Sequence, residues 1–271
     1  MSALGASIRQ LGLIKGRKTR TRKDALPPET EVERWDREWL TYLAREYPQQ
    51  LAHHSAYPDR PELPEEPLDM LEVCVGNWGV LMLYAPGSAI CNKRVMEFGC
   101  GCGNLGKLIA HYASDYLGVD CSPLALGIAR LVSPPNARYL QVDQTDELAS
   151  LAGTVDTLIS RFFWIHQNFR TGRRVLKIVE PLLKPGARLY LDFFWSNPKE
   201  AVGFWRTAVD RLRSPHGSLD AEPSAMFQYS AKDVEELFRG MPFRILQQQE
   251  HGPTQRRFVI AEKTDAVICS I

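Results

Sequence analysis

The stretch that most constrains this chain runs from Val95 to Gly106 and has the sequence VMEFGCGCGNLG. An apolar run contains the acidic Glu97 near its end, three glycines follow at alternate positions, and an amphipathic segment comes next. This order predicts a strand, a tight turn and a helix. Glycines suit such a turn because a side chain there would keep a ligand away from the backbone and from the helix N-terminus. The stretch therefore predicts a ligand-binding turn.

The spacing of the glycines leaves two kinds of ligand to compare. The pattern Gly101-x-Gly103-x-x-Gly106 fits the dinucleotide fingerprint, which is a weak signal when it stands alone. Glu97, two residues before Gly99, argues against a pyrophosphate because a carboxylate repels that group. The same carboxylate suits a cationic ammonium group. The acidic residue therefore favours a cationic ligand over a dinucleotide.

The glycines also form the pattern Gly99-x-Gly101-x-Gly103, two residues after Glu97. This pattern resembles motif I of the class I S-adenosylmethionine (SAM) methyltransferases, of the small-molecule type. In that family the acidic residue faces the methionine end of the cofactor, and the glycine turn lies beside the adenosine. The resemblance covers about residues 90–263 and implies that the chain binds SAM and releases S-adenosylhomocysteine.

From Lys93 onward, strand-like and helical segments alternate, which predicts an α/β fold with a parallel sheet covered on both faces. Strands are expected at 94–98, 116–119, 137–142, 154–160, 188–193, 243–249 and 257–262, and helices at 104–113, 123–132, 168–180, 198–213 and 230–238. The resemblance implies a seven-stranded Rossmann-like sheet in the order 3-2-1-4-5-7-6, with strand 7 antiparallel.

Ligands of such sheets bind beyond the carboxyl ends of the strands. Asp120 ends the second strand and is expected to accept hydrogen bonds from two ribose hydroxyls. Asp143 ends the third strand and could take the adenine amino group; for either aspartate, the alternative is a helix N-cap. The residues that the resemblance assigns to the cofactor are Glu97, Gly99, Gly101, Gly103, Asp120, Cys121, Asp143, Gln144 and Ser160.

The segment Ser160–His166, SRFFWIH, follows the fourth strand and is the candidate wall of the acceptor site. His166 is expected to act as a base or to orient the acceptor, and the alternative is a surface or capping histidine. Arg161 could bind an acceptor carboxylate or pair with a surface acid. Trp164 completes the predicted catalytic set. Phe193, Phe194 and Trp195 either close the other side of this site or belong to the core.

No metal is expected in this site, because the leaving group of a sulfonium is already activated. The six cysteines are scattered and form no C-x-x-C pair, so reduced thiols are favoured over a metal site. Cys100-Gly101-Cys102 could supply only half of a metal site.

Three regions are expected along the chain. Residues 1–29 form a flexible basic tail, in which the run 15–23 either contacts RNA or an acidic partner or is simply solvated. Residues 30–89 form a helical extension or lid, with a second helix at about 68–85. Residues 90–271 form the SAM-binding domain, with an insertion at about 196–229.

The extension begins with a capping box, Thr30-x-x-Glu33, and continues with an apolar face that includes Trp35 and Trp39. This face is expected to pack on the main domain; alternatively, one of the two tryptophans lines a substrate pocket as part of a lid. A homodimer paired through the N-terminal helices is left open.

Composition excludes several functions. The net charge of +1 gives no overall field that would favour nucleic acid or an anionic membrane. No apolar run approaches the roughly 20 residues that span a bilayer, and the start of the chain has no signal-peptide core, so a cytoplasmic protein is expected.

Together with the family resemblance, the sequence predicts a SAM-dependent enzyme acting on an O, N or C nucleophile of a small molecule. The alternatives are an RNA or protein methyltransferase, an NAD-linked oxidoreductase and a non-catalytic nucleotide-binding protein.

Overall fold

The computed structural model describes residues 30–41, 87–195, 212–213, 226–251 and 256–265. The predicted basic tail, the predicted helix at 68–85 and most of the predicted insertion lie outside these residues, so those expectations stay predictions.

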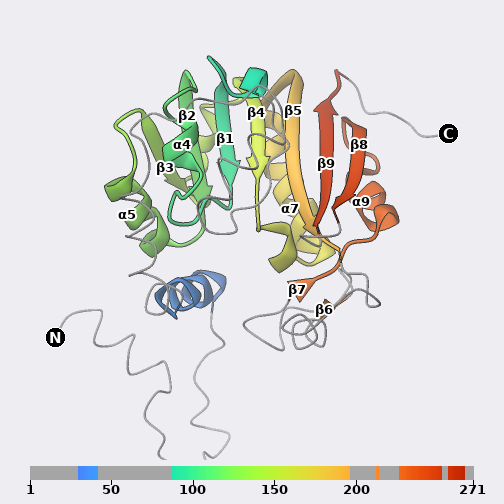
Figure 1. Ribbon diagram of the computed structural model, residues 1–271, viewed down its shortest axis with the longest axis horizontal. Helices are drawn as coiled ribbons and strands as arrows, with labels where there is room; N and C mark the ends of the chain where they lie inside the picture. Colours follow the sequence, from blue (N-terminus) through green and yellow to red (C-terminus); the bar gives the residue numbers. More distant parts are fainter. Residues whose placement is uncertain (1–29, 42–86, 196–211, 214–225, 252–255, 266–271) are drawn as a thin grey trace, which may run out of the picture.

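A seven-stranded sheet forms the centre of the protein, in the order β3-β2-β1-β4-β5-β9-β8 (Figure 1). Its strands are β1 (Arg94–Phe98), β2 (Asp115–Asp120), β3 (Ala137–Gln141), β4 (Val155–Ser160), β5 (Leu183–Phe194), β8 (Phe243–His251) and β9 (Arg256–Lys263). Strands β1 to β5 are parallel, and β9 pairs antiparallel with both β5 and β8. With β8 and β9 as the sixth and seventh strands, the predicted order and the antiparallel seventh strand are confirmed.

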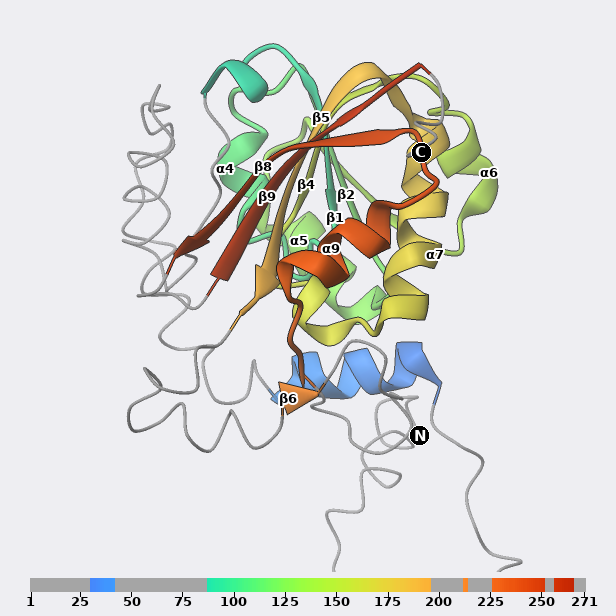
Figure 2. The same cartoon turned by 90° about the vertical axis from the view of Figure 1, so that its right-hand side faces the viewer.

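Helices cover both faces of the sheet (Figure 2). They are α4 (Gly106–Ile109), α5 (Pro123–Val132), α6 (Thr145–Ala149), α7 (Phe169–Val179) and α9 (Ala231–Phe238), with 3₁₀ helices at Gly87–Ala89, Trp164–His166 and Glu180–Leu182. One buried apolar cluster joins α4 and α5 to the sheet, and a larger one joins α6, α7 and α9 to the opposite face. Such layering is the expected solution for a parallel sheet whose two faces are apolar.

Local sequence signals place two of these helices as predicted. Ser122 caps α5, because its hydroxyl accepts a hydrogen bond from the Ala125 amide at 3.0 Å. Ser230 and Asp233 form a reciprocal capping box at the start of α9.

Three predicted boundaries are wrong. Regular helix is limited to Gly106–Ile109 rather than 104–113, because the following residues form tighter turns such as the bond from the Tyr112 amide to the Ile109 carbonyl. The predicted helix at 198–213 does not extend to its last two residues, since Leu212–Arg213 form β6 and pair with β7 (Met226–Phe227). Strand β5 begins at Leu183 rather than 188, because Leu183 already pairs with β4.

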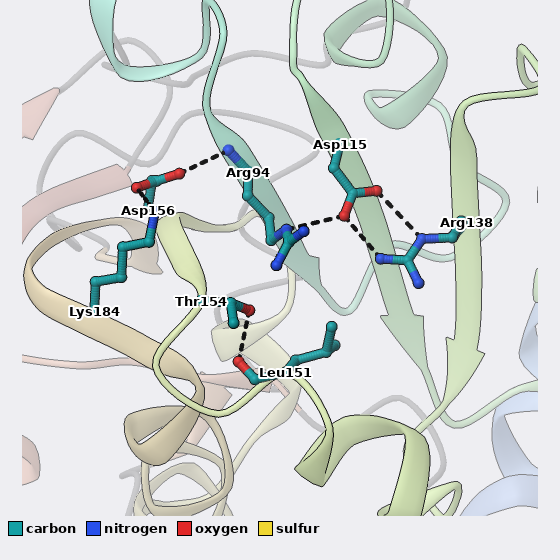
Figure 3. A network of polar contacts seen from close by, with 7 residues as sticks. All are labelled: Arg94, Asp115, Arg138, Leu151, Thr154, Asp156 and Lys184. Carbon is teal, nitrogen blue, oxygen red and sulfur yellow. Dashed lines mark hydrogen bonds and ion pairs between the residues drawn. The ribbon is translucent and has the colours of Figure 1, made fainter.

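A network of ion pairs ties the strands together at their amino ends (Figure 3). Asp115 of β2 binds Arg94 of β1 and Arg138 of β3, with N–O distances of 3.0 and 2.8 Å. Asp156 of β4 accepts from the Arg94 amide and pairs with Lys184. Because these groups are partly exposed, each ion pair contributes only about 0–1 kcal/mol to the free energy of unfolding. They lie at the edge of the sheet opposite the predicted site.

The N-terminal helix, residues 31–41, lies across the carboxyl edge of the sheet, where it is drawn in blue (Figures 1 and 2). Its predicted capping box is confirmed: the Glu33 amide donates to the Thr30 hydroxyl at 3.2 Å, and the Thr30 amide donates to the Glu33 carboxylate at 2.9 Å. Of the helices in the described ranges, none has the length and apolar character needed to cross a membrane.

Candidate active site

The loop between β1 and α4 holds three glycines in left-handed backbone conformations. Gly99, Gly101 and Gly103 have φ angles of +78°, +51° and +74°, which L side chains rarely adopt. The loop is also crowded: a β-carbon at Gly99 would lie 2.5 Å from the Phe163 ring, and one at Gly103 would lie 2.7 Å from the Tyr139 hydroxyl. Glycine is therefore required here both by conformation and by space.

Asp120, at the end of β2, ties this loop to the start of α5. One carboxylate oxygen accepts from the Gly101 amide and the other from the Ser122 amide, both at 2.9 Å. Burial raises the pKa of Asp120, and these backbone hydrogen bonds oppose the rise. Because Ser122 caps α5, the alternative role of Asp120 as its N-cap is excluded.

Glu97 is a buried carboxyl at the same edge, 2% exposed near the end of β1. The Tyr116 hydroxyl donates to its Oε2 at 2.5 Å. Burial raises the pKa of Glu97 to about 7, against the opposing effects of the Arg161 charge and the Tyr116 hydrogen bond. Near neutral pH this carboxyl therefore changes charge readily, and a nearby cation would favour its ionised form.

The other residues assigned to the cofactor make contacts within the protein. The Ser160 hydroxyl donates to the Phe98 carbonyl at 2.8 Å and joins the ends of β4 and β1. The Gln144 side-chain carbonyl accepts from the Gln141 amide at 2.7 Å, and the Cys121 carbonyl accepts from the Gln141 side chain at 3.1 Å. Asp143 is exposed just after β3. All four lie at or near the carboxyl ends of their strands, as predicted.

The predicted acceptor wall divides into two parts. Arg161 is 8% exposed and lies within electrostatic range of Glu97, while His166 ends the 3₁₀ helix half-buried. Trp164 is instead a core residue, 1% exposed, with its ring 5.2 Å from that of Phe193. Phe193 is itself fully buried in the same core cluster, so for this residue the core alternative holds.

The N-terminal helix closes over the carboxyl edge of the sheet. Three of its side chains contact the loops that follow β1, β2 and β4: Trp39 lies on Gly101, Asp36 on Ser122 and Trp35 on His166. Asp36 accepts from the Ser122 hydroxyl at 2.5 Å and from the Leu124 amide at 3.3 Å. One helix thus links three loops that carry predicted site residues.

Asp36 and the buried pair formed by Asp192 of β5 and Arg256 of β9 were not among the residues predicted from the sequence. Asp192 could have been found as a charged residue inside the apolar run LYLDFFW. Nothing near Asp36 or Arg256 in the sequence indicates their partners, which are far away along the chain.

The residues of the loop suit a cofactor that carries an ammonium group and a ribose diol, because the carboxylates of Glu97 and Asp120 lie near a backbone turn without side chains.

Thiolate chemistry is not favoured in this loop: burial raises the pKa of the Cys102 thiol to about 12 and that of Cys100 well above its usual value. Within the ranges the structure describes, no group of three or more His, Cys, Asp or Glu side chains could hold a metal ion.

Comparison with known proteins finds methyltransferases. A family model described as a methyltransferase domain matches residues 96–189. The chain is 25% identical over 204 residues to a ubiquinone biosynthesis O-methyltransferase of Acinetobacter baylyi, covering 73% of this chain and 82% of that protein. It is 27% identical over 108 residues to the protein of the same name from Aeromonas salmonicida, covering 40% of this chain and 45% of the relative.

Solved structures share the fold. A SAM-dependent methyltransferase from Anabaena variabilis superposes with a TM-score of 0.54 at 16% identity, covering 89% of this chain and 97% of that one. The 1,6-didemethyltoxoflavin-N1-methyltransferase of Burkholderia thailandensis superposes with a TM-score of 0.52 at 15% identity, covering 89% and 92%. The chain therefore has the Rossmann-like fold of these methyltransferases, and residues 96–189 match a methyltransferase domain.

Proposed function

We propose that this chain transfers a methyl group from SAM to a small organic acceptor. The observation that carries the proposal is that Glu97 lies near the end of β1, next to the glycine turn in the chain, while Asp120 ends the adjacent strand β2 and accepts from the Gly101 amide of that turn. The relatives named as ubiquinone biosynthesis O-methyltransferases support a small organic acceptor and favour a hydroxyl oxygen as the nucleophile.

The cofactor would be held by the carboxyl edge of β1, β2 and β3. Each oxygen of Asp120 already accepts one backbone amide and still has a lone pair for a ribose hydroxyl. Glu97 would face the ammonium group, whose positive charge stabilises the ionised carboxylate. The adenine amino group would lie near Asp143 and Gln144, which follow β3.

Bound SAM supplies a methyl group on a positively charged sulfur, which leaves as a neutral thioether. The protein then has to align the acceptor and exclude water. Positioning of this kind can lower the activation free energy by about 7–11 kcal/mol. His166 would take a proton from the acceptor. Where the nucleophile loses a proton in the reaction, such a base raises the rate by about 10²–10⁴-fold. Arg161 would orient the acceptor beside it.

The N-terminal helix would act as a lid over the bound cofactor. It already contacts the loops after β1, β2 and β4, so a cofactor bound between these loops would have restricted contact with water. Exclusion of water strengthens the electrostatic interactions inside such a site. The lid therefore couples binding of the cofactor to the position of Trp35, Asp36 and Trp39.

The proposal can be tested with SAM that carries a deuterated methyl group. The purified protein is incubated with this SAM and a cell extract divided into small-molecule, protein and RNA fractions, and each is analysed by mass spectrometry. We expect the label only in the small-molecule fraction. Label in RNA or protein would contradict the small-molecule acceptor, and no label together with no binding of S-adenosylhomocysteine would contradict the enzyme assignment.

A further inference from the structure

A buried tyrosine lies beside Glu97, the carboxyl that precedes the glycine turn. Tyr116 belongs to β2, the neighbour of β1 in the sheet, and its side chain is fully buried (Figure 1). Its hydroxyl donates to Glu97 Oε2 at 2.5 Å, and Glu97 is itself buried. The hydrogen bond therefore joins β2 to the side chain that we assign to the ammonium group of the cofactor.

The sequence makes room for this tyrosine with a glycine. A β-carbon on Gly106, the first residue of α4, would collide with the hydroxyl and the ring of Tyr116. The three glycines of the turn have positive φ angles, whereas Gly106 does not, so space rather than conformation requires glycine at this position. Gly106 thus lets α4 approach β2 while the Tyr116 hydroxyl stays on Glu97.

The Tyr116 hydroxyl is a donor that keeps its proton. Burial and the nearby Glu97 charge raise the pKa of Tyr116 well above its usual value. Its hydrogen bond favours the ionised form of Glu97 and so acts against the effect of burial on the pKa of that carboxyl. Within the described ranges, no hydrogen bond reaches the other oxygen, Oε1. The tyrosine therefore holds one carboxylate oxygen and leaves the other available to a ligand.

Charged and titratable groups from several elements act on Glu97. They are Arg161 after β4, Asp120 at the end of β2, Tyr116 in β2, Tyr139 in β3 and Cys100 in the loop. Arg161 and Tyr116 favour the ionised carboxylate, whereas burial and the Asp120 charge oppose it. Of the described residues, Tyr116 alone forms a hydrogen bond with the Glu97 side chain. It is therefore the neighbour that can fix the orientation of the carboxylate as well as its charge.

We propose that Tyr116 is a positioning residue for the cofactor: it holds Glu97 so that one carboxylate oxygen is available to the ammonium group of SAM. This inference rests on the proposed function, because it concerns the cofactor of that reaction. Asp120 and the residues after β3 are assigned to the adenosine end, which Tyr116 does not contact through Glu97. Loss of the hydroxyl should therefore weaken ligands that carry the ammonium group and spare ligands that lack it.

The test compares two ligands by calorimetry. S-adenosylhomocysteine has the amino-acid end, whereas 5′-methylthioadenosine has the adenosine and the sulfur without it. In Y116F at pH 7, we expect the affinity for S-adenosylhomocysteine to fall at least about fivefold, because the carboxyl loses a hydrogen bond that favours its charged form. The affinity for 5′-methylthioadenosine should change by less than about twofold. The loss should be smaller at pH 8.5, where more of the Glu97 carboxyl is ionised in both proteins.

Tyr139 provides the matched control. It is also buried and its ring lies 5.9 Å from that of Tyr116, but its hydroxyl is hydrogen-bonded to Ser133. Y139F should therefore keep its affinity for S-adenosylhomocysteine within about twofold. G106A should displace the Tyr116 hydroxyl and cause the same selective loss as Y116F. In an E97Q background, Y116F should have little further effect, because the charge that the hydroxyl supports is already absent.

Several outcomes would overturn the proposal. Equal losses of both ligands in Y116F and G106A, or loss of the fold in both variants, would give Tyr116 a structural role only. Unchanged affinity for S-adenosylhomocysteine in both variants, an equal loss in Y139F, or additive effects of Y116F and E97Q would also overturn it. If the unmodified protein binds neither ligand, the proposed function is contradicted instead.

Discussion

The indole ring of Trp39 fills the position that a side chain on Gly101 would need. Trp39 belongs to the N-terminal helix, and Gly101 lies in the loop after β1, where its φ is +51°. The glycine therefore serves two purposes: it allows the left-handed turn, and it lets the helix approach the backbone. The loop that we assign to the cofactor and the helix that we assign to the lid are thereby in direct contact.

This contact should be measurable as an energetic coupling between the two residues. Gly101→Ala adds strain at a positive φ and a clash with the indole, so we expect it to lower the free energy of unfolding by about 1–3 kcal/mol. In a Trp39→Ala background the clash is absent and only the strain remains. Urea denaturation of the four proteins should give a coupling of about 0.5–3 kcal/mol. Additive effects would show that the two residues do not interact.

The contact between Asp36 and Ser122 should hold the N-terminal helix on the domain. Asp36→Ala removes the acceptor for the Ser122 hydroxyl and the Leu124 amide. We expect the free energy that holds the helix on the domain to fall by about 1 kcal/mol, which should speed amide hydrogen exchange in residues 31–41 about fivefold. Glu38→Gln is the control, since Glu38 pairs only weakly with Arg37, at 3.4 Å, on the same helix. Unchanged exchange in Asp36→Ala would mean that other contacts hold the helix.

Local signals in the sequence were sufficient for much of the fold. The capping residues Thr30 and Ser122 predict the starts of helices, and the alternation of apolar segments predicts the strands, because these features depend on neighbours in the chain. The order of the strands in the sheet was implied by the family resemblance. The bounds of α4 were predicted too wide, and the sequence does not show that the Tyr116 hydroxyl lies beside Gly106, the first residue of this helix. Contacts of this kind join residues that no local pattern relates.

In the candidate site too, residues placed by local sequence pattern were predicted correctly, whereas side-chain directions set by tertiary packing were not. Glu97 and Asp120 were found because each lies at or near the end of a strand whose position is readable from the sequence. Trp164 was assigned to the acceptor wall from its place after β4, but its ring packs in the core. The direction of a side chain in an irregular segment depends on tertiary packing, which the sequence does not display.

Glu97→Gln should change how stability depends on pH. The pKa of Glu97 is raised from 4.5 to about 7, so the folded state keeps the proton over this range while the unfolded state releases it. Stability is therefore lost as the pH rises from 4.5 to 7, and the loss is complete above 7. Glutamine does not titrate, so the free energy of unfolding of the variant should not show this loss. Relative to the unmodified protein, it should rise by about 2–4 kcal/mol as the pH increases from 4.5 to 8.

The measurement is thermal unfolding of both proteins from pH 4.5 to 8, with S-adenosylhomocysteine affinity measured at pH 8. The variant should be the more stable protein at pH 8 and should bind the ligand more weakly, because it lacks the negative charge. Parallel stability curves would contradict the raised pKa.

Trp164→Ala should act on stability. Removal of this fully buried ring leaves a cavity in the larger core cluster, and we expect the free energy of unfolding to fall by about 3–5 kcal/mol. Urea denaturation measures this loss directly. An unchanged free energy of unfolding with a loss of methyl transfer would restore Trp164 to the catalytic set.

The most direct test of the account compares the two ends of β2. Asp120→Asn removes the charge that we assign to the ribose hydroxyls, while Asp115→Asn changes an aspartate at the opposite edge of the same strand. Calorimetric titration with S-adenosylhomocysteine should show affinity reduced at least about tenfold in Asp120→Asn and changed by less than about twofold in Asp115→Asn. Equal affinity in Asp120→Asn and the unmodified protein would contradict the assignment of this edge as the cofactor site.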